Sequence, residues 1–391
     1  MNAQDFRNVL CKNIIPFWNR MADKEYGGFY GYADAAGVPD KKSDKGVILN
    51  SRILWFYSSA YLLLKEEKLL ENAGHAYRFL IEKCLDKENG GVYWAVDFKG
   101  NVSEDMKHTY SQAFAVYALS AYYEACGEPE ALKTAMDIYH VMEEKCKDEG
   151  GYLESFGRDF TLSKDNEKLS ENGVTAQRTM NTILHVMEAY TVLYKVNPCE
   201  ELQKSMEEIA DILRDKIYND QTKRLEVFFD REYHSLIDLE SYGHDIEASW
   251  LIARAIEVFN KKEITEKLDP IVDILAETTY KNGLMGKQEA LYNECENGVD
   301  DTRRVWWVQA EAVTGFYNIF QRHPEKTEYK TVSENIFAYI QEHFMDKEHG
   351  EWLENIYDEE EKNKNQARAH QWKCPYHNGR MCMEMMQRLA H

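Results

Sequence analysis

One stretch of the chain places side chains that can move protons at the start of a helix. In residues Ser241 to Trp250, Gly243 is followed by His244 and, three positions later, by Glu247. On a helix this spacing places both side chains on one face, where the carboxylate would orient the imidazole and adjust its basicity. A histidine held in this way transfers protons near neutral pH. An ordinary helix with an acidic first turn would show the same pattern, so this stretch alone leaves both interpretations open.

The elements that would position such side chains repeat along the chain. An amphipathic helix over residues 6–21 runs into a turn, Asp23 to Tyr32, that is rich in glycine and aromatic residues. Further copies of this turn begin at Asp86, Lys147, Asn219, Tyr280 and Asp346. Intervals of roughly sixty to seventy residues are too regular to be accidental. Each copy predicts a helix stopped by glycine, a tight turn and a short extended piece.

A second helix follows each turn, which makes every unit a helical hairpin. These second helices are predicted to begin near residues 50, 108, 178, 242, 301 and 374, mostly at a capping residue or a proline. Six hairpins form either an open array or a closed barrel. An open array needs polar end units, whereas the first and last units here are as aromatic as the others. We therefore predict an all-α fold, a six-hairpin (α/α)6 barrel with short β pieces in the rim loops, as a single catalytic domain over residues 1–391.

If the second helices line the barrel, their first turns meet at one end, where we expect a pocket. The residues offered there are polar or aromatic, and each one alone could equally be structural. They are Arg52, Tyr110, Asn181, His185, His244, Glu247, Trp306, Trp307, Glu311, Trp372 and His377. Because all of them are expected at or near the first turns of the inner helices, at the same end of the barrel, a functional interpretation is favoured for the set.

The residue types in this set indicate proton transfer on a sugar. His244 and His377 belong to helices two units apart, so they would flank a substrate from different sides. Two such histidines suit removal of a proton from one face of a carbon and its return to the other. A carbon beside an aldehyde is acidic enough, and Arg52 or His185 could hold the negative charge that develops on oxygen. The many Tyr and Trp residues offer flat faces for sugar rings.

Four segments carry a resemblance to a known family. They are Asn50 to Tyr57, Tyr242 to Glu247, Trp306 to Ala312 and Trp372 to Arg380. With them the chain resembles the N-acylglucosamine 2-epimerase superfamily over essentially its whole length. Within this family, proline commonly follows the tryptophan pair. Here that position is Val308, so which of Trp306 and Trp307 faces the sugar stays open.

The resemblance implies a six-hairpin barrel that needs no cofactor. It further implies reversible inversion at C2 of the reducing residue of a β-1,4-linked disaccharide, through an opened ring and a cis-enediol. His244 and His377 would be the acid/base pair, with Glu247 as partner of His244 and Arg52 and His185 supporting the intermediate. Sugar would be bound by Tyr110, Asn181, Trp306, Trp307, Glu311 and Trp372. The preferred disaccharide remains open between cellobiose, lactose and mannobiose.

Composition narrows the possible partners. A net charge of −21 argues against nucleic acid and anionic membrane surfaces, so we expect a small-molecule substrate. We see no basic-then-apolar leader and expect no apolar run long enough to cross a bilayer. The eight cysteines include no C-x-x-C pair, which favours reduced thiols and disfavours a zinc site built from them. We therefore expect a cytoplasmic monomer without cofactor or metal.

Other functions fit parts of the same residue set. The same base could serve a mannobiose 2-epimerase, an N-acylglucosamine 2-epimerase or a ketose–aldose isomerase of free monosaccharides. Glycoside hydrolysis would use Glu247 and Glu311 as paired carboxylates, but two rim histidines are superfluous there. A metal site could be built from His185, His244, His377 and Glu247. A non-catalytic sugar-binding module would have no need for the histidines.

Overall fold

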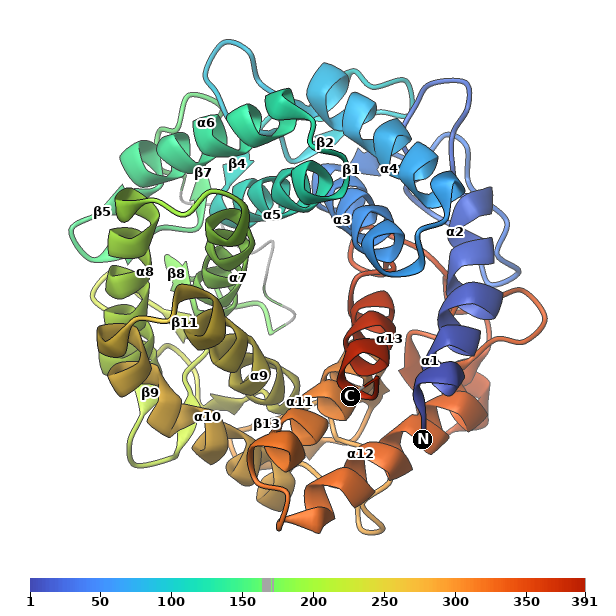
Figure 1. Cartoon of the computed structure of the whole chain (residues 1–391), viewed down its shortest axis with the longest axis vertical. Helices are drawn as coiled ribbons and strands as arrows, with labels where there is room; N and C mark the ends of the chain where they lie inside the picture. Colours follow the sequence, from blue (N-terminus) through green and yellow to red (C-terminus); the bar gives the residue numbers. More distant parts are fainter. Residues whose placement is uncertain (164–169, 171, 391) are drawn as a thin grey trace.

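The computed structural model, which describes residues 1–163, 170 and 172–390, is a double ring of helices (Figure 1). The inner ring consists of α3 (Val47–Leu64), α5 (Thr109–Cys126), α7 (Met180–Val196), α9 (Tyr242–Phe259), α11 (Trp306–Arg322) and α13 (His377–Arg388). The outer ring consists of α1 (Ala3–Val9) with α2 (Ile15–Arg20), α4 (Glu67–Phe79), α6 (Pro129–Lys145), α8 (Glu200–Ile212), α10 (Lys262–Asn282) and α12 (Thr327–Tyr339). The predicted six-hairpin barrel with the second helices inside is confirmed.

Wide π turns extend several outer helices. They cover Leu10–Ile14 between α1 and α2, Leu80–Cys84 after α4, Leu213–Ile217 after α8 and Ile340–Phe344 after α12. A short 3₁₀ helix covers Glu360–Asn363. Because a π turn inserts one residue, it rotates the helix face that follows. Each of these turns has apolar residues buried against the core, which include Leu80 and Phe344.

Short strands occupy the loops at one end. They are β1 (Lys45–Gly46), β2 (Ala95–Val96), β3 (Val102–Glu104), β4 (Lys107–His108), β5 (Lys147–Asp148), β6 (Gly151–Tyr152), β7 (Ser155–Phe156), β8 (Arg178–Thr179), β9 (Tyr218–Asn219), β10 (Arg224–Leu225), β11 (Phe228–Phe229), β12 (Leu239–Glu240), β13 (Glu294–Glu296), β14 (Val299–Asp301), β15 (Arg304–Val305) and β16 (Asn355–Ile356). All their pairings are antiparallel.

These strands join each unit to the next around the rim. The strand that precedes an inner helix pairs with a strand of the following unit, as in β1–β2, β4–β7, β8–β11, β12–β13 and β15–β16. A bridge between Ala33 and Ala369 makes the same connection from the sixth unit to the first. The ring is therefore closed by backbone pairing, as the aromatic end units predict.

The repeated turns hold the first turns of the inner helices in place. On α5, the Gln112 side chain accepts from the backbone N–H of Val92 at 2.6 Å and donates to its carbonyl at 2.8 Å. On α11, Gln309 makes the same pair of hydrogen bonds with Leu291. A side-chain amide that satisfies both backbone groups of a buried residue fixes the helix start relative to the turn. The neighbouring residues on the helix are thereby held at the rim.

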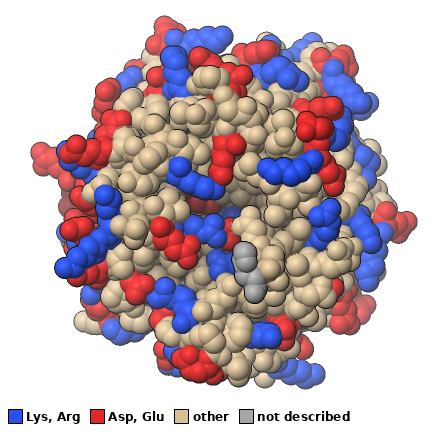
Figure 2. All heavy atoms as spheres, viewed as in Figure 1, with Lys and Arg blue, Asp and Glu red and all other residues tan. Residues whose placement is uncertain are grey.

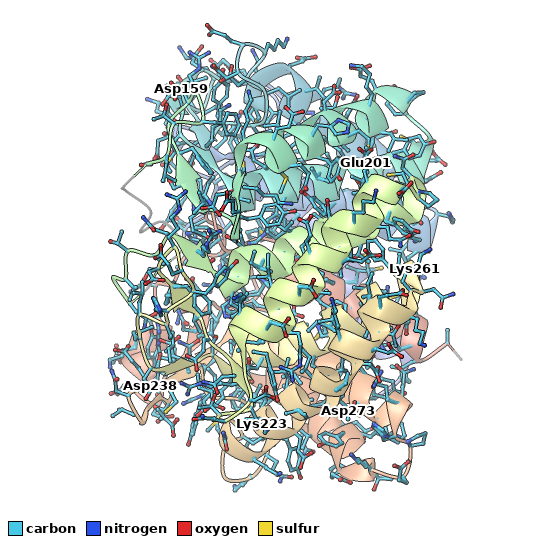
Figure 3. All side chains as sticks on the ribbon, turned by 90° about the vertical axis from the view of Figure 1, so that its left-hand side faces the viewer. Asp159, Glu201, Lys223, Asp238, Lys261 and Asp273 are labelled. Atoms are coloured by element: carbon cyan, nitrogen blue, oxygen red, sulfur yellow. The ribbon has the colours of Figure 1, made fainter. Side chains whose placement is uncertain are left out.

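The two ends of the barrel differ in loop length. In Figure 3 the labelled residues Asp159 and Asp238 lie at the strand-bearing end, and Glu201 and Lys261 lie at the opposite end. At that opposite end, single short connections such as residues 65–66 join the first five inner helices to the outer helix that follows each of them. The N-terminal turns of the inner helices face the strand-bearing end, which is where the sequence places the pocket.

Helix α3 corrects one expectation. By length and composition alone it could cross a membrane, although the sequence led us to expect no such segment. In the structure, 72% of this 18-residue window is buried inside the protein. An inner helix contacts outer helices on one side and inner helices on the others, so it is apolar around most of its circumference. The composition of α3 therefore follows from its place in the inner ring.

Charged side chains are distributed over the surface. On the face shown in Figure 2, acidic and basic groups are interspersed around the edge, and the centre of the face is hollowed. The net charge of −21 is thus not gathered into one patch on this face.

Candidate active site

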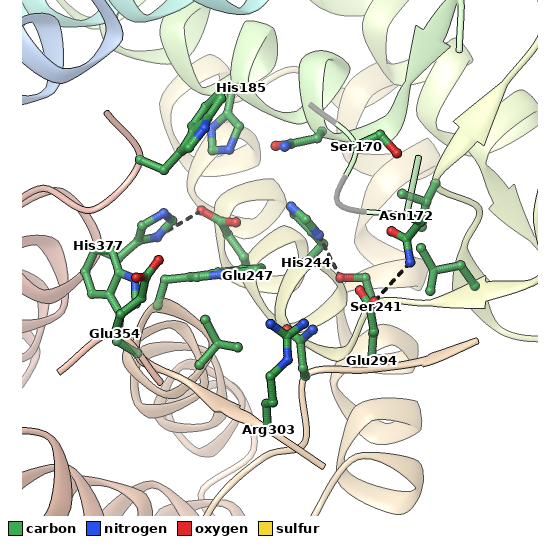
Figure 4. A pocket seen from close by; sticks show the side chains of 18 of the residues that line it. Ser170, Asn172, His185, Ser241, His244, Glu247, Glu294, Arg303, Glu354 and His377 are labelled. Atoms are coloured by element: carbon green, nitrogen blue, oxygen red, sulfur yellow. Dashed lines mark hydrogen bonds and ion pairs between the residues drawn. The ribbon is translucent and has the colours of Figure 1, made fainter. Parts of the chain in front are cut away.

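A pocket with a volume of about 320 Å³ lies at the strand-bearing end, over the first turns of the inner helices. Ten of the eleven candidate residues line it: Arg52, Tyr110, Asn181, His185, His244, Glu247, Trp306, Trp307, Trp372 and His377. The exception is Glu311. Figure 4 shows His377 and His244 on different sides of the pocket, with His185 at another edge. The prediction that side chains from the first turns of the inner helices meet at one pocket is confirmed.

His377 is held by a carboxylate from a neighbouring helix. Its Nδ1 lies 2.7 Å from Oε1 of Glu311, and its ring packs against the rings of Trp306 and Trp307. A carboxylate accepts the proton of Nδ1, which leaves Nε2 unprotonated and able to accept a proton. Burial, followed by the charge of Arg380, lowers the pKa of His377 well below its usual value. The imidazole is therefore neutral at neutral pH, with Nε2 free to accept a hydrogen bond or a proton.

Glu311 lies in a different place from the one that its predicted role requires. The sequence assigned it to sugar binding, but it is 1% exposed and lies beneath the pocket wall. Besides His377, it accepts a hydrogen bond from Nε1 of Trp250 at 2.9 Å and one from Arg380 at 2.8 Å. Glu311 lies more than one turn into α11, which places it deeper than the residues of the first turn.

His244 is held by a hydroxyl group. Its Nδ1 lies 2.7 Å from Oγ of Ser241, and its ring centroid lies 4.8 Å from that of Trp307. Burial, with a smaller contribution from His185, lowers the pKa of His244 to about 3. The two flanking histidines therefore have different partners, one a carboxylate and the other a serine.

The predicted pairing of Glu247 with His244 is wrong. Glu247 Oε1 instead accepts a hydrogen bond from Arg380 and lies 3.9 Å from Nδ1 of His377. The reason is depth: Glu247 lies one turn below His244, at the level where the guanidinium of Arg380 reaches in from α13. Its second oxygen is buried without a hydrogen-bond partner among the described residues. Burial and the neighbouring Glu311 raise the pKa of Glu247 to about 8.

The same spacing does form a pair on another helix. Nδ1 of His185 lies 2.9 Å from Oε2 of Glu188, three residues further along α7. Although burial alone would raise it, Arg380 and His185 hold the pKa of Glu188 at about 2. Sequence reasoning missed Glu188 and Arg380. The His-x-x-Glu spacing at residues 185–188 is the signal that would have found Glu188.

Arg52 and Tyr110 form a rigid polar corner of the pocket. Nη2 of Arg52 donates to the hydroxyl of Tyr110 at 2.7 Å, and the guanidinium lies 4.2 Å from the ring centroid of Phe114. The Nε of Arg52 and the Oδ1 of Asn181 are buried without partners among the described residues. Unpaired buried polar atoms are costly unless a ligand satisfies them, so this corner suits a polyhydroxylated molecule.

The three tryptophans of the pocket, Trp306, Trp307 and Trp372, lie in different surroundings. Trp306 is 3% exposed with its ring edge against His377, whereas Trp307 is more exposed and lies beside both flanking histidines. Trp307 is therefore the better placed of the pair to face a sugar ring. Trp372 is half-buried near Trp94 and Tyr110, with ring centroids about 6 Å apart.

Within the part of the chain that the structure describes, one buried cluster has the composition of a metal site. Ligand atoms of Glu247, Glu311 and His377 lie within 4.8 Å of one another. The guanidinium of Arg380 already donates to both carboxylates. A second cation would be repelled by this charge, and His185 and His244 do not belong to the cluster. The predicted metal alternative is therefore disfavoured.

Comparison with known proteins places the chain among sugar epimerases. A model of the N-acylglucosamine 2-epimerase (GlcNAc 2-epimerase) family matches residues 28–379. A cellobiose 2-epimerase of Eubacterium cellulosolvens is 48% identical, over 97% of this chain and 96% of that protein. One of Ruminococcus albus is 45% identical over 99% of both chains. The solved structure of cellobiose 2-epimerase from Bacillus thermoamylovorans superimposes with a TM-score of 0.92 at 42% identity, over 99% of both chains.

Proposed function

The chain belongs to the N-acylglucosamine 2-epimerase family, and on this premise we propose that it is a cellobiose 2-epimerase. It reversibly inverts C2 of the reducing glucose of cellobiose to give 4-O-β-D-glucopyranosyl-D-mannose, and it acts on lactose in the same way. The observation that carries the mechanism is the pair of pocket histidines with unlike partners, Glu311 on one and Ser241 on the other.

His377 is the base in one direction of the reaction. Once the reducing sugar has opened, Nε2 of His377 removes the proton from C2, and the electron pair moves into the carbonyl group to form a cis-enediolate. The imidazolium that forms is stabilised by Glu311 at 2.7 Å. Arg52 also lines the pocket and holds the negative charge on oxygen, whereas His185, whose Nδ1 faces the ionised Glu188, accepts a hydrogen bond from a substrate hydroxyl at Nε2.

His244 completes the inversion from the other side. For this step His244 carries a second proton, which the negative charge of the enediolate favours, and its Nδ1–H donates to Oγ of Ser241. Nε2 gives its proton to the opposite face of C2, because the two histidines lie on different sides of the pocket (Figure 4), and His244 is left neutral. Between turnovers His377 loses its proton to solvent and His244 regains one. In the reverse reaction the two histidines exchange roles.

Glu247 binds a substrate oxygen in this proposal. With a pKa of about 8, it carries a proton at neutral pH, and its free oxygen can donate a hydrogen bond into the pocket. Asn181 and Tyr110 contribute further polar contacts, and Trp307 provides a face for the reducing sugar. Trp372, in the loop before α13, is placed to stack on the second sugar.

A single chain provides this whole site, so we propose a monomer as the functional unit and one domain over residues 1–391. The eight cysteines are unpaired, which supports action in a reducing compartment such as the cytoplasm. Glycoside hydrolysis is disfavoured because Glu247 and Glu311 bind the same guanidinium and Glu311 lies beneath the pocket wall. A hydrolase needs its two carboxylates to flank the glycosidic bond.

Product analysis tests the proposal. The purified protein is incubated in heavy water with cellobiose and, separately, with glucose, mannose and N-acetylglucosamine, and the products are resolved by chromatography. We expect 4-O-β-D-glucopyranosyl-D-mannose from cellobiose, with deuterium at C2 of the reducing residue. Released glucose would indicate hydrolysis, and conversion of the free monosaccharides alone would indicate an isomerase or another epimerase. An epimerised product without deuterium at C2 would exclude the two-histidine mechanism.

A further inference from the structure

Arg380 lies beneath the pocket, at the centre of a buried cluster of carboxylates. The residue is 2% exposed and forms no part of the pocket wall. Nη1 donates to Glu188 at 2.5 Å, whereas Nη2 donates to Glu311 at 2.8 Å and also to Glu247. One cation on α13 thus contacts carboxylates from α7, α9 and α11.

Two of these carboxylates are the partners of pocket histidines. Glu188 holds His185 at 2.9 Å, and Glu311 holds His377 at 2.7 Å. Arg380 and His377 bind the same atom, Oε1 of Glu311. The guanidinium is therefore one contact away from the imidazole that removes the C2 proton.

The cluster depends on this charge. Besides the three carboxylates, His185 and His377, the titratable or charged groups that face it are Arg52 on α3, Tyr110 and Tyr117 on α5, His244 on α9 and Tyr376 before α13. Arg52 is directed to Tyr110, so Arg380 is the cation that touches the carboxylates. Without it, buried carboxylates would take up protons, because an unpaired buried charge is costly.

Protonation of Glu311 would change the state of His377. A neutral carboxyl group donates its proton to Nδ1, which moves the imidazole proton to Nε2, the nitrogen that must accept the C2 proton. We propose that Arg380 is a positioning residue that keeps Glu311 ionised and so holds His377 in the tautomer with Nε2 free. The catalytic use of this tautomer rests on the proposed function. The tautomer of His377 can be tested whatever reaction the protein catalyses.

The tautomer can be measured without any substrate. Protein with ¹⁵N-labelled histidines is examined by long-range ¹H–¹⁵N correlation at pH 7, and His377 is assigned by the signal that His377→Gln lacks. We expect an Nδ1–H imidazole in the wild type and in Arg380→Lys, and an Nε2–H imidazole in Arg380→Met. Arg388→Met, which removes another arginine from the same helix, should leave the signal unchanged. An unchanged tautomer in folded Arg380→Met would overturn the proposal.

Kinetics provide the second measurement. Arg380→Met should lower kcat on cellobiose by roughly 10–100-fold, by analogy with residues that orient the ligands of a metal ion, with KM within about threefold. The acid limb of its kcat profile should move to higher pH, because Glu311 loses the cation that favours its ionised form. In Arg380→Lys the acid limb of the kcat profile should lie at the same pH as in the wild type, and in Arg388→Met it should not move. A loss in Arg380→Met that is uniform across pH would indicate a structural role and contradict the proposal.

A variant that fails to fold still leaves a test. Arg380→Met combined with Glu188→Gln removes one charge of each sign and leaves Glu311 without its cation. This double variant should also show the Nε2–H imidazole, and an Nδ1–H imidazole there would refute the role of Arg380. If the wild type left cellobiose unchanged, the proposed function would fail, whereas the NMR comparison would still decide the inference.

Discussion

The neighbouring carboxylates Glu247 and Glu311 accept different numbers of hydrogen bonds, and this difference indicates which of them carries a proton at neutral pH. Glu311 accepts from His377, Trp250 and Arg380, whereas Glu247 accepts from Arg380 and has one oxygen without a partner among the residues that the structure describes. Burial raises the pKa of both. A carboxylate that accepts more hydrogen bonds ionises more easily. At neutral pH we therefore expect Glu311 to be ionised and Glu247 to carry a proton.

Amide substitutions should therefore have unequal effects at these two positions. Glu311→Gln removes the charge that fixes the tautomer of His377, and we expect kcat on cellobiose to fall by roughly 10²–10⁴-fold with KM nearly unchanged. Glu247→Gln resembles the protonated side chain, so at pH 7 its kcat should fall by less than about tenfold. Steady-state kinetics on both variants check this, and a larger loss in Glu247→Gln than in Glu311→Gln would contradict the assignment.

The pH dependence supplies the control for this comparison. Glu247 has its pKa raised to about 8, so its proton is present below that pH and is lost as the pH rises through it. If the substrate needs the hydrogen bond, wild-type kcat/KM should decline above about pH 8. Glu247→Gln cannot ionise and should lack this decline, whereas a decline of the same size in both proteins would assign it to another group.

At the scale of elements, repetition in the sequence predicted the helices well. The turn residues and glycines mark where outer helices end, and the predicted inner helix starts lie within five residues of those observed. What the sequence could not predict is contact between helices. The partner of His377 comes from α11, and the His-x-x-Glu spacing forms a pair at His185 but not at His244. The spacing of residues determines which face of a helix they share. The partner that a carboxylate on this face binds is determined by charges on neighbouring helices, such as that of Arg380.

The packing of α9 against α11 gives a prediction at Gly243. A Cβ atom at this position would lie 2.5 Å from Cη2 of Trp307 and 2.7 Å from Cγ2 of Val308. Gly243→Ala should therefore displace the indole that lies beside both flanking histidines. We expect kcat/KM on cellobiose to fall by roughly 10–100-fold, since a shift of about 1 Å in a positioning group can have this effect.

Gly286→Ala is the matched control for this substitution. A Cβ atom there would meet none of the described residues within 4 Å, so kcat/KM should stay within about twofold of the wild type. The melting temperatures of both variants show whether the loss in Gly243→Ala is local. Equal kinetics in the two variants would mean that Trp307 does not position the substrate.

At the scale of the whole molecule, closure of the ring assembles the pocket. The bridge between Ala33 and Ala369 joins the last unit to the first, and Trp372 follows it by three residues. As a result, Trp372 packs near Trp94 and Tyr110 of the second unit, more than 250 residues away along the chain. The aromatic end units predicted this closure, although no local pattern could specify which rim residues would meet.

That position makes Trp372 the residue we expect to select a disaccharide over a monosaccharide. The reducing sugar lies at the histidines, so the second sugar extends past the half-buried indole, where stacking contributes on the order of 1–2 kcal/mol. Trp372→Ala should raise KM for cellobiose roughly tenfold and leave any residual activity on mannose or glucose unchanged. Trp372→Phe, which keeps a flat face, should recover part of the loss. Equal losses on both classes of sugar, together with a lower Tm, would show that the indole only packs the joint between the last unit and the second.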